Sequence, residues 1–65
     1  MRIIAHTKYG VFKSTETEYD EGEYAAMERF LERVNEYEYF SMKTDEGAVY
    51  MSKGMIGDTL FVIEK

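Results

Sequence analysis

The chain has 65 residues and a formal net charge of −5 at pH 7, and it contains no cysteine, proline or tryptophan. These numbers exclude a disulfide framework, a thiolate zinc site and a cysteine nucleophile. The longest apolar run, residues 60–63, is too short to span a membrane, and we expect no secretory signal at the beginning of the chain. We therefore expect one domain, residues 1–65, that works in the cytoplasm without a membrane partner.

The first elements of the chain have the composition of strands. Residues 2–6 and residues 11–15 are both rich in β-branched and apolar side chains. The turn between them, Thr7 to Gly10, ends in a glycine that can adopt a positive φ. This pattern predicts an N-terminal hairpin.

One amphipathic helix is expected over residues 21–35. Asp20 is a good N-cap residue, and Tyr19 and Tyr24 have the spacing of a hydrophobic staple around it. Apolar residues then recur at i, i+3, i+4 and i+7, which is the helical period. Asn35 is the expected last residue, in a left-handed conformation.

After the helix the apolar period changes to two. Residues 39–43 and 48–52 alternate between apolar and polar side chains, and a turn containing Gly47 separates them. Residues 54–58 are bounded by glycine and predict a plain turn. Residues 59–63 form a last strand that is apolar on both faces, so it is expected to be central in its sheet or covered twice.

The predicted order β-β-α-β-β-β defines an α+β fold, in which one helix packs on one face of an antiparallel sheet. Such a helix is about 22 Å long and cannot cover five strands, so apolar sheet surface is left for a partner. The small size of the chain also makes a homodimer an expectation. The predicted core consists of Ile3, Ala5, Phe12, Met27, Phe30, Leu31, Val34, Phe40, Met42, Val49, Met51, Leu60 and Val62.

Charge is distributed unevenly along the chain. Residues 16–38 carry nine acidic and two basic side chains, and three of the glutamates are spaced by four residues. Such a stripe is either a solvated helix face or a docking face for a basic partner, where its carboxylates mimic the phosphates of a nucleic acid. The predicted contact surface on the helix consists of Glu21, Glu28, Arg29, Glu32 and Glu36.

A second candidate site lies on the predicted open face of the sheet. Tyrosine next to lysine on such a face is suited to stacking and neutralising a nucleotide or a single-stranded nucleic acid. The acidic net charge counts against long nucleic acids, and the same face is an alternative contact for a homodimer. The residues of this candidate are His6, Lys13, Tyr39, Lys43 and Tyr50.

No motif for catalysis or for cofactor binding is visible. Residues 54–57 have the G-x-x-G spelling of a nucleic-acid-binding loop, but strands are expected on both sides of it. The lone His6 has no nucleophile elbow, and no phosphate-binding loop or calcium loop is present. We therefore expect no enzyme, no metal and no cofactor. The predicted function is a small acidic interaction module, an inhibitor or adaptor of the viral or mobile-element type.

Overall fold

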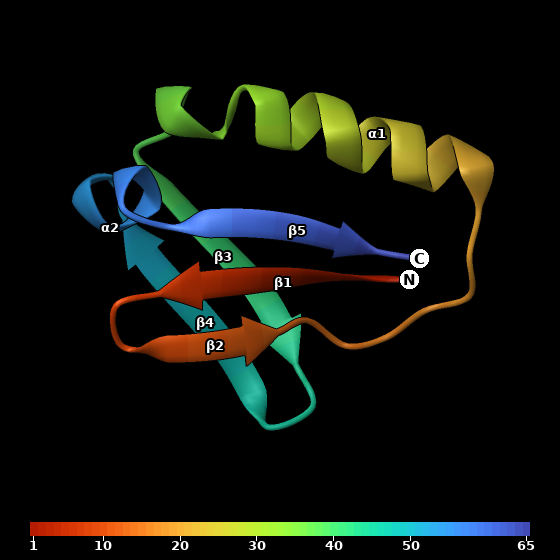
Figure 1. Ribbon diagram of the computed structural model, residues 1–65, viewed down its shortest axis with the longest axis horizontal. Helices are drawn as coiled ribbons and strands as arrows, with labels where there is room; N and C mark the ends of the chain where they lie inside the picture. The colour runs from red at the N-terminus through yellow and green to blue at the C-terminus, as the bar shows by residue number, and fades with distance from the viewer.

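The computed structural model describes all residues, 1–65, and confirms the α+β class. Five strands, a main helix α1, a 3-10 turn η1 and a short helix α2 follow one another along the chain (Figure 1). Their bounds are β1 Arg2–Thr7, β2 Gly10–Lys13, α1 Glu21–Glu32, η1 Val34–Glu36, β3 Tyr39–Thr44, β4 Gly47–Ser52, α2 Lys53–Gly57 and β5 Leu60–Glu64.

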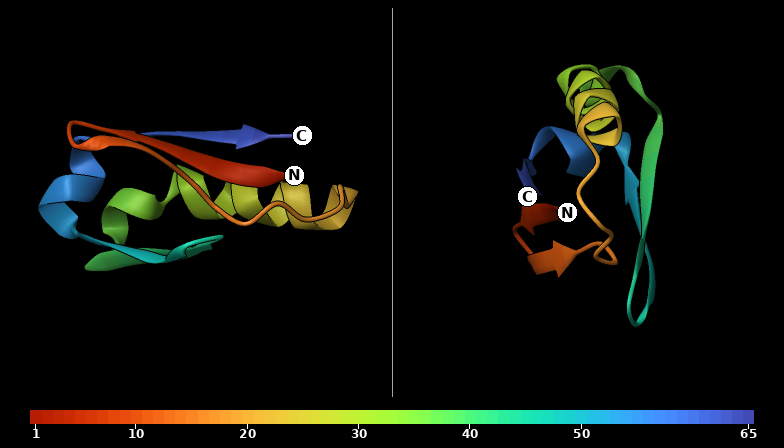
Figure 2. Two further views of the ribbon diagram at one scale, coloured as in Figure 1. Left: turned by 90° about the horizontal axis from the view of Figure 1, so that it is seen from below. Right: turned by 90° about the vertical axis from the view of Figure 1, so that its right-hand side faces the viewer.

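The five strands form two antiparallel sheets where a single sheet was expected. One sheet has the order β2-β1-β5, and the other is the β3–β4 hairpin. Figure 2 shows them as two layers, with α1 running alongside β5. The Phe40 ring from β3 meets the Phe61 ring from β5 between the layers, with the ring centroids 5.0 Å apart. The core is therefore enclosed by two sheets and one helix.

Both β-hairpins turn through the same short sequence, T-x-x-G. Gly10 and Gly47 each close a turn at positive φ, 134° and 145°, as expected from their positions. In each turn the threonine Oγ1 accepts a hydrogen bond from the second loop residue, at 3.0 Å in Thr7 and 3.3 Å in Thr44. Local side-chain chemistry is thus sufficient to place both turns.

Helix α1 begins where the sequence predicts but ends earlier. The Asp20 carboxylate accepts from the Glu23 backbone N–H at 3.1 Å, and the Tyr19 and Tyr24 rings lie 6.1 Å apart. The predicted end at Asn35 is wrong, because α1 stops at Glu32 and no residue other than glycine has a positive φ. The chain continues there as the 3-10 turn η1, which places the Val34 side chain in the core at 5% exposure.

Burial confirms most of the predicted core. Ile3, Ala5, Val34, Phe40, Met42 and Met51 are buried, and Phe12, Met27, Leu31 and Val49 are half-buried against them. Phe30 is the least buried of the predicted helical core residues, at 36% exposure, since it lies at the rim against the Tyr37 ring at 5.1 Å.

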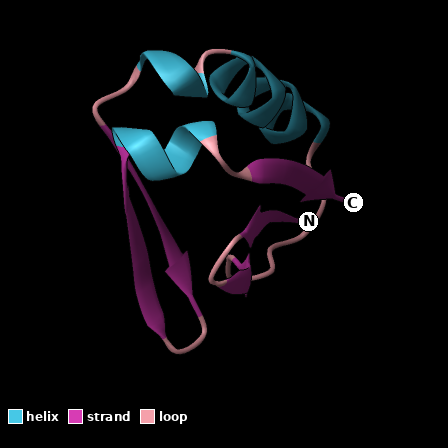
Figure 3. Cartoon of the chain, turned by 60° about the vertical axis from the view of Figure 1, so that its left-hand side comes forward, coloured by secondary structure: helices cyan, strands magenta, loops and turns pink.

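The predictions for the last strand and the turn before it are wrong. Leu60 and Val62 are 65% and 39% exposed, and β5 lies at the edge of its sheet, not at the centre. Phe61 pairs with Ala5, a core-facing residue of β1, so Phe61 faces the core and its two neighbours point outward. The expected plain turn is the helix α2, drawn between β4 and β5 in Figure 3, and its Ile56 is buried at 1% exposure.

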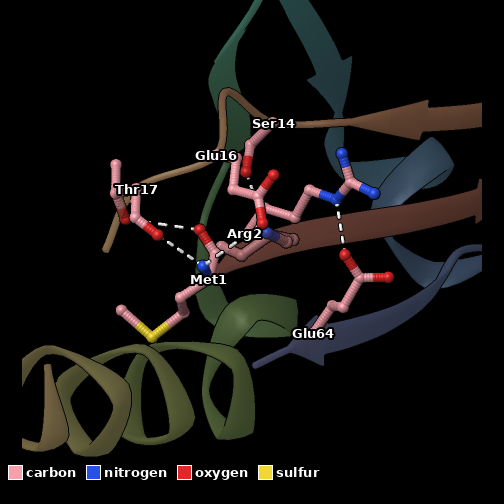
Figure 4. A network of polar contacts seen from close by, with 7 residues as sticks. Met1, Arg2, Ser14, Glu16, Thr17 and Glu64 are labelled. Carbon is pink, nitrogen blue, oxygen red and sulfur yellow. Dashed lines mark hydrogen bonds and ion pairs between the residues drawn. The ribbon is translucent and has the colours of Figure 1, made fainter. Parts of the chain in front are cut away.

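The segment that links β2 to α1 is bound to the first strand. The Ser14 backbone N–H donates to the Ile3 carbonyl at 2.9 Å, and the Ile3 N–H donates to Ser14 Oγ at 2.8 Å. Further along, the Thr17 N–H donates to the Met1 carbonyl at 2.9 Å, and the Met1 ammonium donates to the Thr17 carbonyl (Figure 4). The Ile3 backbone is therefore directed towards the β2 side of the sheet.

Candidate functional site

Three exposed carboxylates of α1 lie next to the core-facing side of the helix, and we call them the acidic stripe; Glu36, which continues the four-residue spacing in the sequence, lies outside α1. Glu21, Glu28 and Glu32 are spaced by seven and four residues, so they share one side of α1 and are all exposed. The four ion pairs of the protein join Met1 to Glu16, Arg2 to Glu64, Arg33 to Glu36 and Lys53 to Glu38. The three stripe carboxylates therefore have no cationic partner within the chain.

Two of the predicted contact residues are placed differently. Glu36 lies in η1, beyond the end of α1, and its carboxylate accepts from Arg33 Nε at 3.2 Å. Arg29 follows Glu28 by one residue, which turns it about 100° away from that glutamate around the helix. Arg29 also precedes Glu32 by three residues, but it forms an ion pair with neither glutamate. The structure thus groups Glu21, Glu28 and Glu32 and places Glu36 beyond them.

A groove runs between α1 and β5, beside this stripe. Its volume is about 340 Å³, and it is open to solvent. Four side chains with apolar bodies line it, and two carboxylates of the stripe complete the lining. The lining residues are Tyr24, Glu28, Leu31 and Glu32 from α1 and Phe61 and Ile63 from β5. We call this feature the α1–β5 groove; it combines an apolar floor with an acidic rim.

The end of the groove near the start of α1 carries a positive charge. Lys65 Nζ lies 4.9 Å from the centroid of the Tyr24 ring and 6.0 Å from that of Tyr19. Such cation–π contacts hold an ammonium group over an aromatic face. The groove thus has a lysine at its Tyr24 end and its two acidic lining residues, Glu28 and Glu32, farther along α1.

The residues of the predicted sheet-face site do not share one face. His6 and Lys13 lie on the outer face of the β2-β1-β5 sheet, whereas the other three belong to the β3–β4 hairpin. There Tyr39 and Tyr50 are 69% and 76% exposed, on the opposite side from the buried Phe40. Because the inner faces of the two sheets meet in the core, their outer faces point away from each other. Lys43 lies on the same face of the hairpin as the two tyrosines.

The outer face of the three-stranded sheet carries aliphatic side chains beside polar ones. His6 pairs with Val11 on one side and Leu60 on the other, and Ile4 pairs with Lys13 and Val62. Val11, Leu60 and Val62 are exposed at 54%, 65% and 39%. Apolar side chains in one patch on a sheet are typical of a contact surface.

Sequence reasoning found the acidic rim of the groove but missed its floor. The predicted core contains Leu60 and Val62 and omits Phe61 and Ile63, because a strand that is apolar on both faces gives no alternation from which to choose. The signal that was available lies in pairing: Ala5 and Ile3 are small or aliphatic residues of the first strand, and their partners across the sheet are these two residues.

No group of three or more histidine, cysteine, aspartate or glutamate side chains in the fold is arranged to hold a metal ion. None of its helices has the length and apolar character needed to cross a membrane. Comparisons with family models, with curated proteins and with solved structures return no match for this chain.

Proposed function

We propose that the protein is a non-enzymatic interaction module that binds a larger basic protein through α1 and the groove beside it. The observation that carries this proposal is the pair Glu28 and Glu32, which line an apolar groove and have no cationic partner in the chain. By binding, the module would inhibit or adapt its partner in the cytoplasm. Its carboxylates would occupy a surface that otherwise binds nucleic-acid phosphates.

The physical cost of this arrangement supports a functional reason for it. Glu28 and Glu32 are one helical turn apart, and like charges at that spacing destabilise a helix by about 0.2–0.5 kcal/mol. Opposite charge on a partner would relieve this repulsion and would accelerate association. The floor formed by Leu31, Phe61 and Ile63 supplies apolar area for burial at the same place.

Charge reversal at the stripe tests the proposal. The double variant Glu28→Lys, Glu32→Lys is expected to lose a basic partner that the wild-type protein retains from a lysate of its host. The retained protein should elute as salt is raised, because added salt shortens the distance over which charges attract, from about 8 Å at physiological ionic strength to about 3 Å at 1 M. Capture is measured by affinity retention and mass spectrometry.

The matched control is the double variant Asp45→Lys, Glu46→Lys. It changes the net charge by the same amount at the exposed tip of the β3–β4 hairpin, where neither carboxylate has an ion pair. Retention of the same partner by this control is expected. Equal capture by all three proteins, or equal loss in both variants, would show that α1 is not the contact surface.

Self-association is the second candidate function, and the exposed Val11, Leu60 and Val62 favour it. In that proposal a homodimer covers the outer face of the three-stranded sheet, a different surface from the α1–β5 groove.

Binding of a nucleotide or single-stranded nucleic acid would depend on the β3–β4 hairpin, with Tyr39, Lys43 and Tyr50 and without His6 and Lys13.

A further inference from the structure

Strand β5 presents an unpaired backbone edge to the α1–β5 groove. It is the last strand of the order β2-β1-β5, and β1 is the only strand to which it pairs. The Ile3 backbone N–H and C=O are both used by Ser14 on the β2 side. Backbone groups alternate along a strand, so Ile4, paired with Val62, directs its N–H and C=O towards β5.

The same alternation identifies the free groups of β5. Val62 exchanges hydrogen bonds with Ile4, so its neighbours Phe61 and Ile63 direct their N–H and C=O groups away from β1. No hydrogen bond from another segment reaches these groups. An unpaired edge of this kind is a template on which a further strand can form.

Helix α1 flanks the place where such a strand would lie. A new strand would lie about 4.8 Å beyond β5, and α1 runs beside β5 at that edge (Figures 1 and 2). The side chains of Phe61 and Ile63 line the groove together with Leu31. Residues of an added strand that point the same way as Phe61 would therefore pack against α1.

The spacing of the rim carboxylates matches the repeat of an extended chain. Glu28 and Glu32 are four residues apart on the helix, which is about 6 Å along its axis. Every second residue of a strand advances about 6.6 Å and points to the same side. Lysine or arginine at alternate positions would thus place its aliphatic stem on Leu31 and its charge at successive carboxylates.

Charge selects a basic segment over a second copy of this chain. A second copy docked edge to edge on β5 would bring its own Glu28 and Glu32 to the same groove, against the net charge of −5. The groove beside the opposite edge strand, β2, is lined by both signs of charge, including Arg2, Lys13 and Glu46. Of these two grooves, only the one beside β5 is lined by carboxylates without a basic side chain.

We propose that the α1–β5 groove receives an extended segment of the partner, with lysine or arginine at alternate positions, as an additional strand on β5. This inference rests on the proposed function and specifies its mode of binding. Main-chain hydrogen bonds to Phe61 and Ile63 would supply affinity, and the Glu28–Glu32 pair would supply selectivity.

The probe is a fluorescent eight-residue peptide that alternates lysine and valine, titrated by anisotropy. A peptide of the same composition with its lysines consecutive is expected to bind about tenfold more weakly, because fewer of them reach the rim. The alternate backbone amides of the first peptide form two sets, and only one set can face β5. Methylation of that set should weaken binding about tenfold, and methylation of the other set should not, since methylation removes hydrogen-bond donors and keeps the charge.

Hydrogen exchange at single amides is the second readout. The alternating peptide should slow exchange at Phe61 and Ile63 and leave Val62 unchanged, since the Val62 amide is already bonded to β1. Equal binding of both peptides without protection of Phe61 and Ile63 overturns strand addition. The proposed function survives that result if Glu28→Gln with Glu32→Gln still abolishes binding, and it fails as well if these substitutions have no effect.

Discussion

The Ser14 hydroxyl shows how a single side chain extends the backbone pairing of this small protein. Its Oγ accepts the Ile3 N–H at 2.8 Å, while the Ser14 N–H donates to the Ile3 carbonyl. Ile3 is 9% exposed, so little water is available to replace that acceptor. The pairing of β1 with the next segment thus continues beyond the last residue of β2.

Replacing this hydroxyl should therefore cost stability. Ser14→Ala leaves the Ile3 N–H without an acceptor, and the free energy of unfolding is expected to fall by about 1–3 kcal/mol. Urea denaturation followed by circular dichroism measures the change. Ser41→Ala is the matched control, because Ser41 is exposed on β3 and its hydroxyl makes no hydrogen bond within the chain. An equal loss of stability in the control would refute the role of Ser14.

The last two elements of the chain, α2 and β5, differ in burial from what their sequences suggest. The glycine-bounded segment forms α2 and buries Ile56, whereas the strongly apolar β5 exposes Leu60. Helix α2 contacts η1, β3 and β4, so it closes one end of the core. Burial here follows from pairing and packing and is not set by the hydrophobicity of a segment.

Two substitutions of aliphatic residues by alanine test this difference in burial between α2 and β5. Ile56→Ala should destabilise the fold by about 2–5 kcal/mol, because it opens a cavity at a position that is 1% exposed. Leu60→Ala removes a side chain that is 65% exposed and should change stability by no more than about 0.5 kcal/mol. Thermal or urea unfolding would compare the stability of the two variants. A larger loss of stability in Leu60→Ala than in Ile56→Ala would contradict the outward orientation of the Leu60 side chain.

Across the molecule, the acidic stripe and the exposed aliphatic side chains lie on different surfaces. Glu21, Glu28 and Glu32 lie on α1, whereas Val11, Leu60 and Val62 lie on the outer face of the three-stranded sheet. Arg2 and Glu64, joined at 2.7 Å, border that outer face at one end. The two surfaces can therefore serve a basic partner and a second copy of the chain without competing.

Native mass spectrometry and sedimentation test the surface assigned to self-association. We expect the wild-type protein to form dimers and Leu60→Glu to be monomeric, because the new carboxylate would be buried in the contact without a partner. Tyr50→Glu, at a side chain that is 76% exposed on the β3–β4 hairpin, should remain dimeric. A monomeric wild type, or dissociation only by the Tyr50 substitution, would contradict this assignment.

The sequence by itself determined the features that depend on neighbouring residues. Asp20 begins α1 because its own carboxylate bonds the first turn, and Gly10 and Gly47 close their turns because positive φ suits glycine. The same local logic located the acidic rim at Glu28 and Glu32. These features require no knowledge of the rest of the chain.

Only the tertiary structure decided the division into two sheets, the outward face of Leu60 and the floor of the groove. Each of these depends on which strand lies beside which, and a strand that is apolar on both faces fits either orientation equally well. Ala5 resolves the choice, because its place in the core brings Phe61, its partner across the sheet, to the same side. The groove exists because that pairing leaves one edge of β5 free next to α1.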